Sequence, residues 1–468
     1  MSGKLIVVSN RIPTAATPSG GLVFALHETL RKTGGIWIGS DPEFQADPSD
    51  TLKEIGDQST YQRLAFEMSE TDYQTFYLGF ANSVLWPVCH RRGDLVQMSR
   101  RFEEGYRRVN KRLARQIFEV AGPEDMIWVH DYHFFPLAAD LRELGFEGKI
   151  GFFLHIPFPA LGDMGALPPS ANLAHWLADY DLVGLQTRSD VARCLEMFRS
   201  ELGAELMHDG KIKYGERRVG VRSFPIGIDV EAFVATAEKS TNREEIAKDL
   251  SGELIIGVDR LDYSKGLPNR FRAFGRYLET RKDKERRPSL LQIAPPTREE
   301  VSAYRDIRFE LEELAGRLNG ENAELDWTPL RYIHRNIDRD VLAKLFRTAR
   351  VGFVTPFADG MNLVAKEYIA AQDPEDPGVL VLSRMAGAAE DMTEALLVNP
   401  YDIEEMSEAL AQALDMPLEE RQARYTACMK RVRATDVGRW SENYLNALKD
   451  SRRDLSWSSF NERHKNSA

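Results

Sequence analysis

The chain has 468 residues and a composition typical of a globular protein, with 43% hydrophobic and 28% charged residues. Its formal net charge of −11 argues against a general surface for nucleic acid or an anionic membrane, but it allows a local basic pocket. Three scattered cysteines, Cys89, Cys194 and Cys428, form neither a disulfide framework nor a zinc motif. Because no apolar run reaches the roughly 18–20 residues of a membrane span, we expect a cytoplasmic protein.

Short apolar segments rich in β-branched residues recur along the chain and alternate with segments of helical periodicity. This alternation predicts parallel sheets covered by helices on both faces. Ten candidate strands are too many for one compact sheet of this kind, so we expect an α/β protein with two Rossmann-like, doubly wound domains. The expected strands are 5–8, 126–129, 150–156, 182–185, 219–224, 254–258, 290–293, 351–355, 379–382 and 396–398, and the expected helices include 102–120, 268–280, 299–317, 339–348 and 363–371.

A domain boundary is expected after the segment 224–229, because a polar stretch follows it before the next strand. We therefore predict an N-terminal domain of residues 1–230, a C-terminal domain of residues 231–437 and a polar tail at 456–468. Ligands of open α/β sheets bind beyond the carboxyl ends of the strands. Two such sheets facing each other would place the active site in the cleft between the domains.

Polar residues follow the predicted strands of the N-terminal domain. Arg11 follows the first strand, and the pair Gly20-Gly21 then precedes a helical pattern, where it either lets the backbone approach a ligand or makes an ordinary tight turn. Asp131 and His155 follow two further strands. Histidine and carboxylate side chains at such ends favour acid–base chemistry, with a purely structural role as the alternative. Metal binding is disfavoured because the chain has no His-Glu-x-x-His motif.

The C-terminal domain has the stronger signals of anion binding. A glycine-bearing turn joins the strand 351–355 to the helix 363–371, and the first N–H groups of a helix attract anions. Asp359 and Glu367 flank this turn, which suits a ligand with phosphate and hydroxyl groups, such as a phosphorylated or nucleotide-linked sugar.

Further cations follow other strands of this domain. Arg260 and Lys265 surround a turn that opens a helix, an arrangement typical of a diphosphate clamp. Arg298 adds a third cation at the end of the strand 290–293. Two solvated surface cations are the alternative to the clamp.

Eight segments in chain order resemble the trehalose-6-phosphate synthases, a family of retaining glycosyltransferases with the GT-B architecture. They lie within about residues 4–400, so the resemblance covers nearly the whole chain. The segments are VVSNR ending at Arg11, SGGL around Gly21, SVLWP around Trp86, WVHDYH around Asp131, FFLHIPFP around His155, DRLDYSKG from Asp259, QIAPPTR ending at Arg298, and DGMNLVAKE from Asp359 to Glu367.

The resemblance implies where the nucleotide-sugar donor binds. Arg260 and Lys265 would hold its diphosphate, the amides of Leu363 and Val364 would cap it, and Glu367 would bind the ribose hydroxyls. The residues 359–362 would contact the donor glucose, and His155 its 6-hydroxyl region. The implied donor-binding set is Gly20, Gly21, Arg260, Lys265, Asp359, Gly360, Met361, Asn362, Leu363, Val364, Ala365, Lys366 and Glu367.

The resemblance also implies an acceptor, glucose 6-phosphate, and a catalytic set of Asp131, His155, Arg260 and Lys265. Asp131 would bind the acceptor hydroxyls, and a helix at about 438–455 would cross back to the first domain. Because no enzyme nucleophile stands out, we favour a front-face mechanism that uses neither metal nor cofactor. The remaining acceptor-binding residues would be Arg11, Tyr77, Trp86 and Arg298.

Several alternatives stay open at the level of sequence. UDP-glucose is the favoured donor, but Ile337 stands where the resemblance leads us to expect an aromatic side chain near the base, which leaves guanosine and adenosine open. A glucosylglycerol-phosphate synthase and a silent sugar-nucleotide sensor are the rival functions. A dehydrogenase is excluded because no Gly-x-Gly-x-x-Gly follows a strand. The sequence neither requires nor excludes a homo-oligomer.

Overall fold

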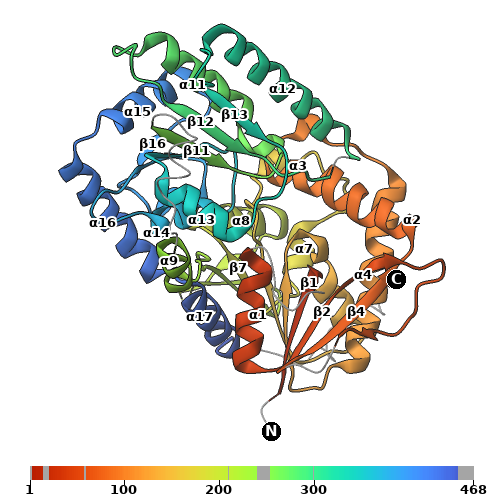
Figure 1. Ribbon diagram of the computed structural model, residues 1–468. Helices are drawn as coiled ribbons and strands as arrows, with labels where there is room; N and C mark the ends of the chain where they lie inside the picture. The colour runs from red at the N-terminus through yellow and green to blue at the C-terminus, as the bar shows by residue number, and fades with distance from the viewer. Residues whose placement is uncertain are drawn as a thin grey trace. The chain divides into compact units, whose positions relative to one another are not determined.

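In a computed structural model of the chain, the described residues are 3–13, 21–56, 60–208, 210–239, 253–298 and 300–451 (Figure 1). The chain forms two compact units. Unit 1 comprises Met1–Phe224 and Gly438–Ala468, and unit 2 comprises Pro225–Val437. The chain therefore passes between the units twice, after Phe224 and after Val437. The polar tail predicted at 456–468 lies outside the described residues.

Unit 1 contains a ten-stranded sheet whose central strands are parallel, as predicted. These strands are buried on both faces, which explains why their sequences are nearly continuous apolar runs. The edges carry short antiparallel strands. In sheet order the strands are β3 (Lys53–Glu54), β4 (Gln62–Met68), β2 (Ile36–Phe44), β1 (Leu5–Arg11), β5 (Met126–His130), β6 (Lys149–Phe153), β7 (Leu182–Leu185), β10 (Arg217–Ser223), β9 (Lys211–Tyr214) and β8 (Glu205–Leu206).

The helices of unit 1 include one unusual element, the π-helix η1 (Tyr73–Leu85). It packs closely against α4 (Arg100–Val120), because a Cβ atom on Gly105 would lie 2.1 Å from Thr75 Oγ1 and one on Gly79 would lie 2.5 Å from the Phe102 ring. Glycine at both positions therefore permits the contact. The other helices and helical turns are α1 (Gly21–Thr33), α2 (Glu70–Asp72), α3 (Trp86–Cys89), η2 (Gly93–Leu95), η3 (Tyr132–Phe134), α5 (Leu137–Glu143), α6 (Leu161–Met164), α7 (Leu173–Leu177) and α8 (Arg188–Leu202).

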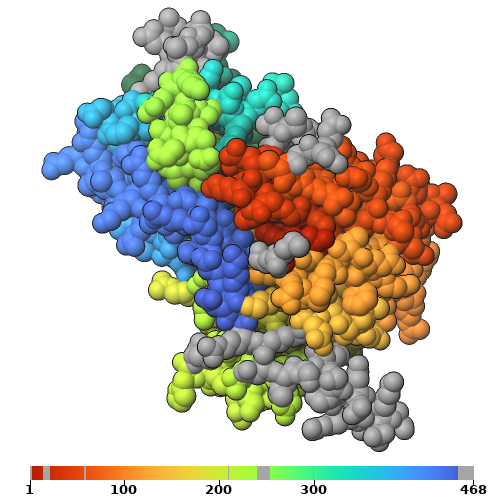
Figure 2. Space-filling model, turned by 90° about the horizontal axis from the view of Figure 1, so that it is seen from below, coloured from red at the N-terminus to blue at the C-terminus, as the bar shows by residue number. Residues whose placement is uncertain are grey.

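The last helix, α17 (Val437–Lys449), packs on the sheet of unit 1, and Figure 2 shows the blue end of the chain bordering orange and yellow surface of this unit. Trp440 lies 5.1 Å from the Trp128 ring of β5. Tyr444 donates a hydrogen bond of 3.0 Å to the carbonyl of Phe152 in β6. A Cβ atom on Gly151 would lie only 2.3 Å from the Tyr444 hydroxyl, so this strand needs glycine where the helix crosses it.

Unit 2 contains a six-stranded, wholly parallel sheet, again as predicted. Helices cover both of its faces (Figure 1). In sheet order the strands are β13 (Leu330–Ile333), β12 (Ser289–Ile293), β11 (Leu254–Val258), β14 (Val351–Val354), β15 (Val379–Ser383) and β16 (Leu396–Val398). The helices and turns are α9 (Val230–Glu238), η4 (Tyr263–Lys265), α11 (Leu267–Thr280), α12 (Ser302–Asn322), α13 (Arg339–Thr348), α14 (Leu363–Ala371), η5 (Gly387–Glu390), α15 (Ile403–Asp415) and α16 (Leu418–Ala434).

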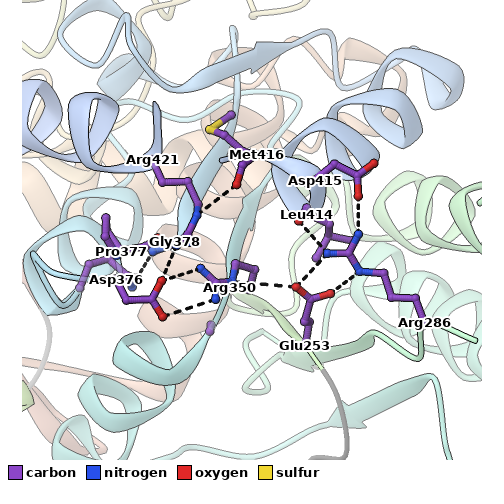
Figure 3. A network of polar contacts seen from close by, with 12 residues as sticks. Glu253, Arg286, Arg350, Asp376, Pro377, Gly378, Leu414, Asp415, Met416 and Arg421 are labelled. Carbon is purple, nitrogen blue, oxygen red and sulfur yellow. Dashed lines mark hydrogen bonds and ion pairs between the residues drawn. The ribbon is translucent and has the colours of Figure 1, made fainter. Parts of the chain in front are cut away.

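A network of arginines and carboxylates lies where strands of unit 2 begin (Figure 3). Arg350, directly before β14, donates to Asp376 at 3.0 Å, and Arg421 of α16 donates to the same carboxylate at 2.7 Å. Arg286 bonds Glu253, directly before β11, and Asp415 at the end of α15. This network fixes the amino ends of the strands, so it lies at the edge of the sheet opposite the edge where ligands are expected.

Candidate active site

The turn between β14 and α14 follows a buried strand and opens a helix, as the sequence predicts. Neighbouring backbone holds it in place: the amide of Gly387 donates to the carbonyl of Asp359 at 3.1 Å, and the amide of Ala388 to that of Met361 at 2.8 Å. Asn362 caps the helix, because its side-chain oxygen accepts a 3.0 Å hydrogen bond from the amide of Ala365. The helix start is therefore rigidly presented.

Three of the predicted donor residues meet at this turn. The ammonium of Lys265 lies 2.6 Å from Asp359 Oδ2, and the side chain of Lys265 is only 9% exposed. Asn362 donates to the same oxygen at 3.0 Å. An anionic ligand would therefore compete with Asp359 for the ammonium. Arg260, just after β11, is exposed to solvent, which fits both a cation that receives a ligand and the alternative of a solvated surface cation.

A buried arginine holds together the strand ends on which these residues stand. Arg270 of α11 has no exposed surface. Its guanidinium donates to Asp259 at 2.6 Å and to Gln292 at 2.8 Å, and its Nε donates to Thr355 at 3.0 Å. These partners belong to the ends of β11, β12 and β14. Arg270 thereby fixes three strand ends relative to one another, a role that the sequence did not reveal.

Lys366 and Glu367, which are neighbours in α14, differ in their surroundings. Lys366 is buried, and its ammonium donates at 2.8 Å to the carbonyl of Ile226 and at 3.3 Å to the Thr435 hydroxyl. Its side chain thus contacts the two segments of unit 2 that lead to unit 1, whereas the resemblance placed it with the donor-binding residues. Glu367 is half-buried, and desolvation raises its pKa to about 7 against the opposing effect of Arg339.

In unit 1, the ends of β5 and β6 bring together three polar side chains. The Asp131 carboxylate accepts a 3.3 Å hydrogen bond from the amide of His155. His130 Nδ1 lies 3.1 Å from His155 Nε2, so one ring donates to the other. Burial lowers the pKa of His155 to about 3, and burial followed by the neighbouring His155 lowers that of His130 well below its usual value. Both rings are therefore neutral at physiological pH, and His155 is suited to hydrogen bonding rather than to carrying charge.

The predicted acceptor residues Tyr77 and Trp86 both face the turn η3. The Tyr77 ring stacks on His133 with 5.7 Å between centroids and 7° between planes. The Trp86 ring lies 5.6 Å from that of Tyr132. Tyr77 and Trp86 are 9% and 3% exposed, so they form a largely buried aromatic wall beside Asp131.

The remaining predicted residues fall as follows. Arg11 is exposed at the end of β1 in unit 1. Arg298 belongs to unit 2 and donates to the Tyr304 hydroxyl at 2.7 Å and towards Asp262 at 3.5 Å. Gly21 begins α1, and Gly20 lies outside the described residues. The roles assigned to all these residues stay predictions.

Backbone strain is concentrated at the predicted site. Within the described ranges, four non-glycine residues have positive φ, and three of them are predicted site residues: Asp131 (74°), Arg298 (48°) and Asn362 (73°). Such conformations cost of order 1–3 kcal/mol each and persist where the surroundings enforce them, which is common at functional sites. Of the same described residues, no group of three His, Cys, Asp or Glu side chains is placed to hold a metal ion, and no helix is long and apolar enough to cross a bilayer.

Two units, each built on a sheet whose central strands are parallel and end in polar turns, define an α/β class of protein. The model of glycosyltransferase family 20 matches residues 6–450, and the chain belongs to that family. It is similar to the trehalose-6-phosphate synthase of Sodalis glossinidius, with 44% identity over 451 residues, 95% of this chain and 96% of the relative.

Solved structures are similar over the same extent. A UDP-forming α,α-trehalose-phosphate synthase from Burkholderia xenovorans, in complex with glucose 6-phosphate, has a TM-score of 0.90 and 45% identity, covering 96% of this chain and 100% of that one. A trehalose-6-phosphate enzyme from E. coli, bound with UDP-2-fluoroglucose, has a TM-score of 0.91 and 41% identity, covering 96% and 99%. The GT-B architecture predicted from sequence is thereby confirmed.

Proposed function

We propose that this protein transfers glucose from UDP-glucose to glucose 6-phosphate and forms trehalose 6-phosphate and UDP. The observation that carries the proposal is the nature of its relatives. Two structures that are 45% and 41% identical to this chain hold glucose 6-phosphate and a UDP-glucose analogue, the two substrates of this reaction. The position of Arg11, Asp131 and Arg260 at or just after the ends of strands supports it further.

In this proposal the two units have different roles. Unit 1 binds the acceptor through Arg11, Tyr77, Trp86 and Asp131, and Arg298 of unit 2 is a further predicted acceptor residue. Unit 2 binds the donor: Lys265 releases Asp359 and joins Arg260 on the diphosphate, while Asp359 turns to the donor glucose. Each charge-assisted hydrogen bond to the diphosphate contributes roughly 1.5–3 kcal/mol.

We place the chemistry on the front face of the donor sugar. The bond between the anomeric carbon and the diphosphate oxygen breaks, and the acceptor hydroxyl bonds to the same face, so the configuration is retained. Its proton passes to the departing diphosphate. Arg260, Lys265 and the start of α14 stabilise the charge that develops there, so the mechanism needs no metal ion. We also place the protein in the cytoplasm.

The test is release of nucleoside diphosphate from UDP-, GDP- or ADP-glucose, with glucose 6-phosphate or glycerol 3-phosphate as acceptor. We expect release with UDP-glucose and glucose 6-phosphate, undiminished by a chelator, and an α,α linkage by NMR. No release with glucose 6-phosphate under any donor would refute the proposal. Release with glycerol 3-phosphate alone would identify the rival glucosylglycerol-phosphate synthase.

Two variants separate the substrates. Arg260→Ala should raise the KM for UDP-glucose by about ten-fold or more, and Arg11→Ala should do the same for glucose 6-phosphate. Arg272→Ala is the matched control, because this arginine lies on the exposed face of α11 and pairs with Glu310. If both site variants altered only stability, the assignment of these residues would be wrong.

A further inference from the structure

The spacing of Tyr77 and Trp86 does not fit an α-helix. Nine residues correspond to two and a half α-helical turns, so the two side chains would point in opposite directions. In a π-helix the bond from residue i to i+5 widens each turn to roughly 4.4 residues, and nine residues complete about two turns. The π-helix η1 includes Tyr77 and the eight residues between it and Trp86, which directly follows η1, and both rings do face η3.

Asn82 lies between them on the same side and is 1% exposed. Its amide nitrogen donates a 2.7 Å hydrogen bond to the carbonyl of Tyr77, five residues earlier. Its amide oxygen accepts a 2.8 Å hydrogen bond from the Tyr132 hydroxyl. The buried side chain of Asn82 therefore links the backbone of Tyr77 to the hydroxyl of Tyr132, whose ring packs against Trp86.

The turn that contains Tyr132 is also held by α4. The Tyr106 hydroxyl donates to the carbonyl of Tyr132 at 2.7 Å, and Asn110 donates to the carbonyl of His133 at 3.1 Å. Tyr132 directly follows Asp131, whose backbone is strained. Asn82 is therefore one of the links between η1 and this turn, beside the packing of η1 on α4 and of the Tyr77 ring on His133, and it is the one that joins the Tyr77 backbone to Tyr132.

We propose that Asn82 is a positioning residue for the acceptor. It sets the π-helical turn so that Tyr77 and Trp86 face the same sugar as Asp131, and it acts through those residues rather than by touching substrate. The inference rests on the proposed function, because the acceptor roles of Tyr77, Trp86 and Asp131 belong to it.

A neighbouring residue provides a matched control. The Ser83 hydroxyl donates at 2.7 Å to the carbonyl of Leu78, also five residues earlier, and Ser83 is 7% exposed. Ser83→Ala therefore removes a buried hydrogen bond within the same helix without touching the bond to Tyr132.

The experiment compares steady-state kinetics and melting temperatures of Asn82→Ala, Ser83→Ala and Tyr132→Phe. We expect Asn82→Ala to raise the KM for glucose 6-phosphate by about ten-fold, with the KM for UDP-glucose changed less than about two-fold. Ser83→Ala should lower the melting temperature by an amount similar to that for Asn82→Ala, but should leave both KM values near those of the parent. Tyr132→Phe, which removes one hydroxyl, should raise the acceptor KM by about three-fold or more.

The double variant Asn82→Ala/Tyr132→Phe should be no worse than Asn82→Ala, since both remove the same contact. Equal effects of Asn82→Ala and Ser83→Ala on the acceptor KM, or equal effects of Asn82→Ala on both substrates, would overturn the inference. A parent enzyme without synthase activity would refute the proposed function instead, so the two failures are distinguishable.

Discussion

Replacing Arg270 by methionine should destabilise unit 2 strongly. The substitution keeps an unbranched side chain as far as the position of Nε but removes the donors to Asp259, Gln292 and Thr355. The largest consequence is at Asp259, whose side chain is 2% exposed and would be left as a buried carboxylate without this partner. Breaking such a pair costs about 3–5 kcal/mol, so we expect a loss of that size in the free energy of unfolding.

Removing one partner of a buried ion pair costs more stability than removing both, and the test compares these two cases. Burial raises the pKa of Asp259, whereas Arg270 lowers it, so removing Arg270 should shift this pKa further upward. The double variant Asp259→Asn/Arg270→Met removes the stranded charge and should recover about 2 kcal/mol of the loss. Urea unfolding followed by circular dichroism, with calorimetry to separate the transitions of the two units, measures both values.

Two results would refute this reasoning. A loss below about 1 kcal/mol in Arg270→Met would mean that the pair contributes no more than an exposed one. A double variant less stable than Arg270→Met would mean that the carboxylate is not the source of the cost. Arg272→Met, on the exposed face of the same helix, controls for the change from arginine to methionine.

Two further predictions concern α14. The pKa of Glu367 is raised to about 7, so its carboxyl is protonated below that pH. The KM for UDP-glucose should therefore fall as pH rises from 6 to 8, because the ionised carboxylate accepts hydrogen bonds from the ribose hydroxyls. Glu367→Gln should flatten this pH profile, and a profile that Glu367→Gln leaves unchanged would contradict the ribose role. The same raised pKa means that the folded state holds a proton that the unfolded state releases, so this group's contribution to stability falls as pH rises through about 4.5–7. Lys366→Met should lower the free energy of unfolding by about 1–3 kcal/mol, because it removes a buried donor that bonds the Ile226 carbonyl and the Thr435 hydroxyl, and should change the donor KM less than two-fold. A donor KM raised as much as in Arg260→Ala would show instead that the ammonium serves the donor.

The sequence identifies features that local chemistry determines. α14 begins and ends at the predicted residues, because a glycine-bearing turn and an asparagine cap mark its start. The buried strands β5, β7, β11 and β14 are predicted to within one residue, since both of their faces are apolar. The strand β2 is not predicted. Its first four residues are buried but its last three are exposed, so its sequence is not a continuous apolar run.

Features that depend on distant partners are not visible in sequence. Arg270 looks like a solvated helix residue, and only the fold brings Gln292 and Thr355 to it. Lys366 belongs to the segment from Asp359 to Glu367 that resembles the family, but its side chain contacts the segments around residues 226 and 435. For η1 one signal does exist, because two aromatic residues expected to bind the same sugar are spaced nine apart, which an α-helix does not allow.

The return of α17 to unit 1 has a consequence for biosynthesis. Unit 2 is continuous in sequence and can complete its core as soon as residue 437 has left the ribosome. Unit 1 begins first but cannot cover Trp128 until Trp440, near the end of the chain, has been made. At the usual rate of about 5–20 residues per second, the nascent sheet of unit 1 waits on the order of tens of seconds with this apolar surface uncovered. Unit 1 is thus synthesised first but completes its fold last, and during this interval its uncovered apolar surface is open to chaperone binding.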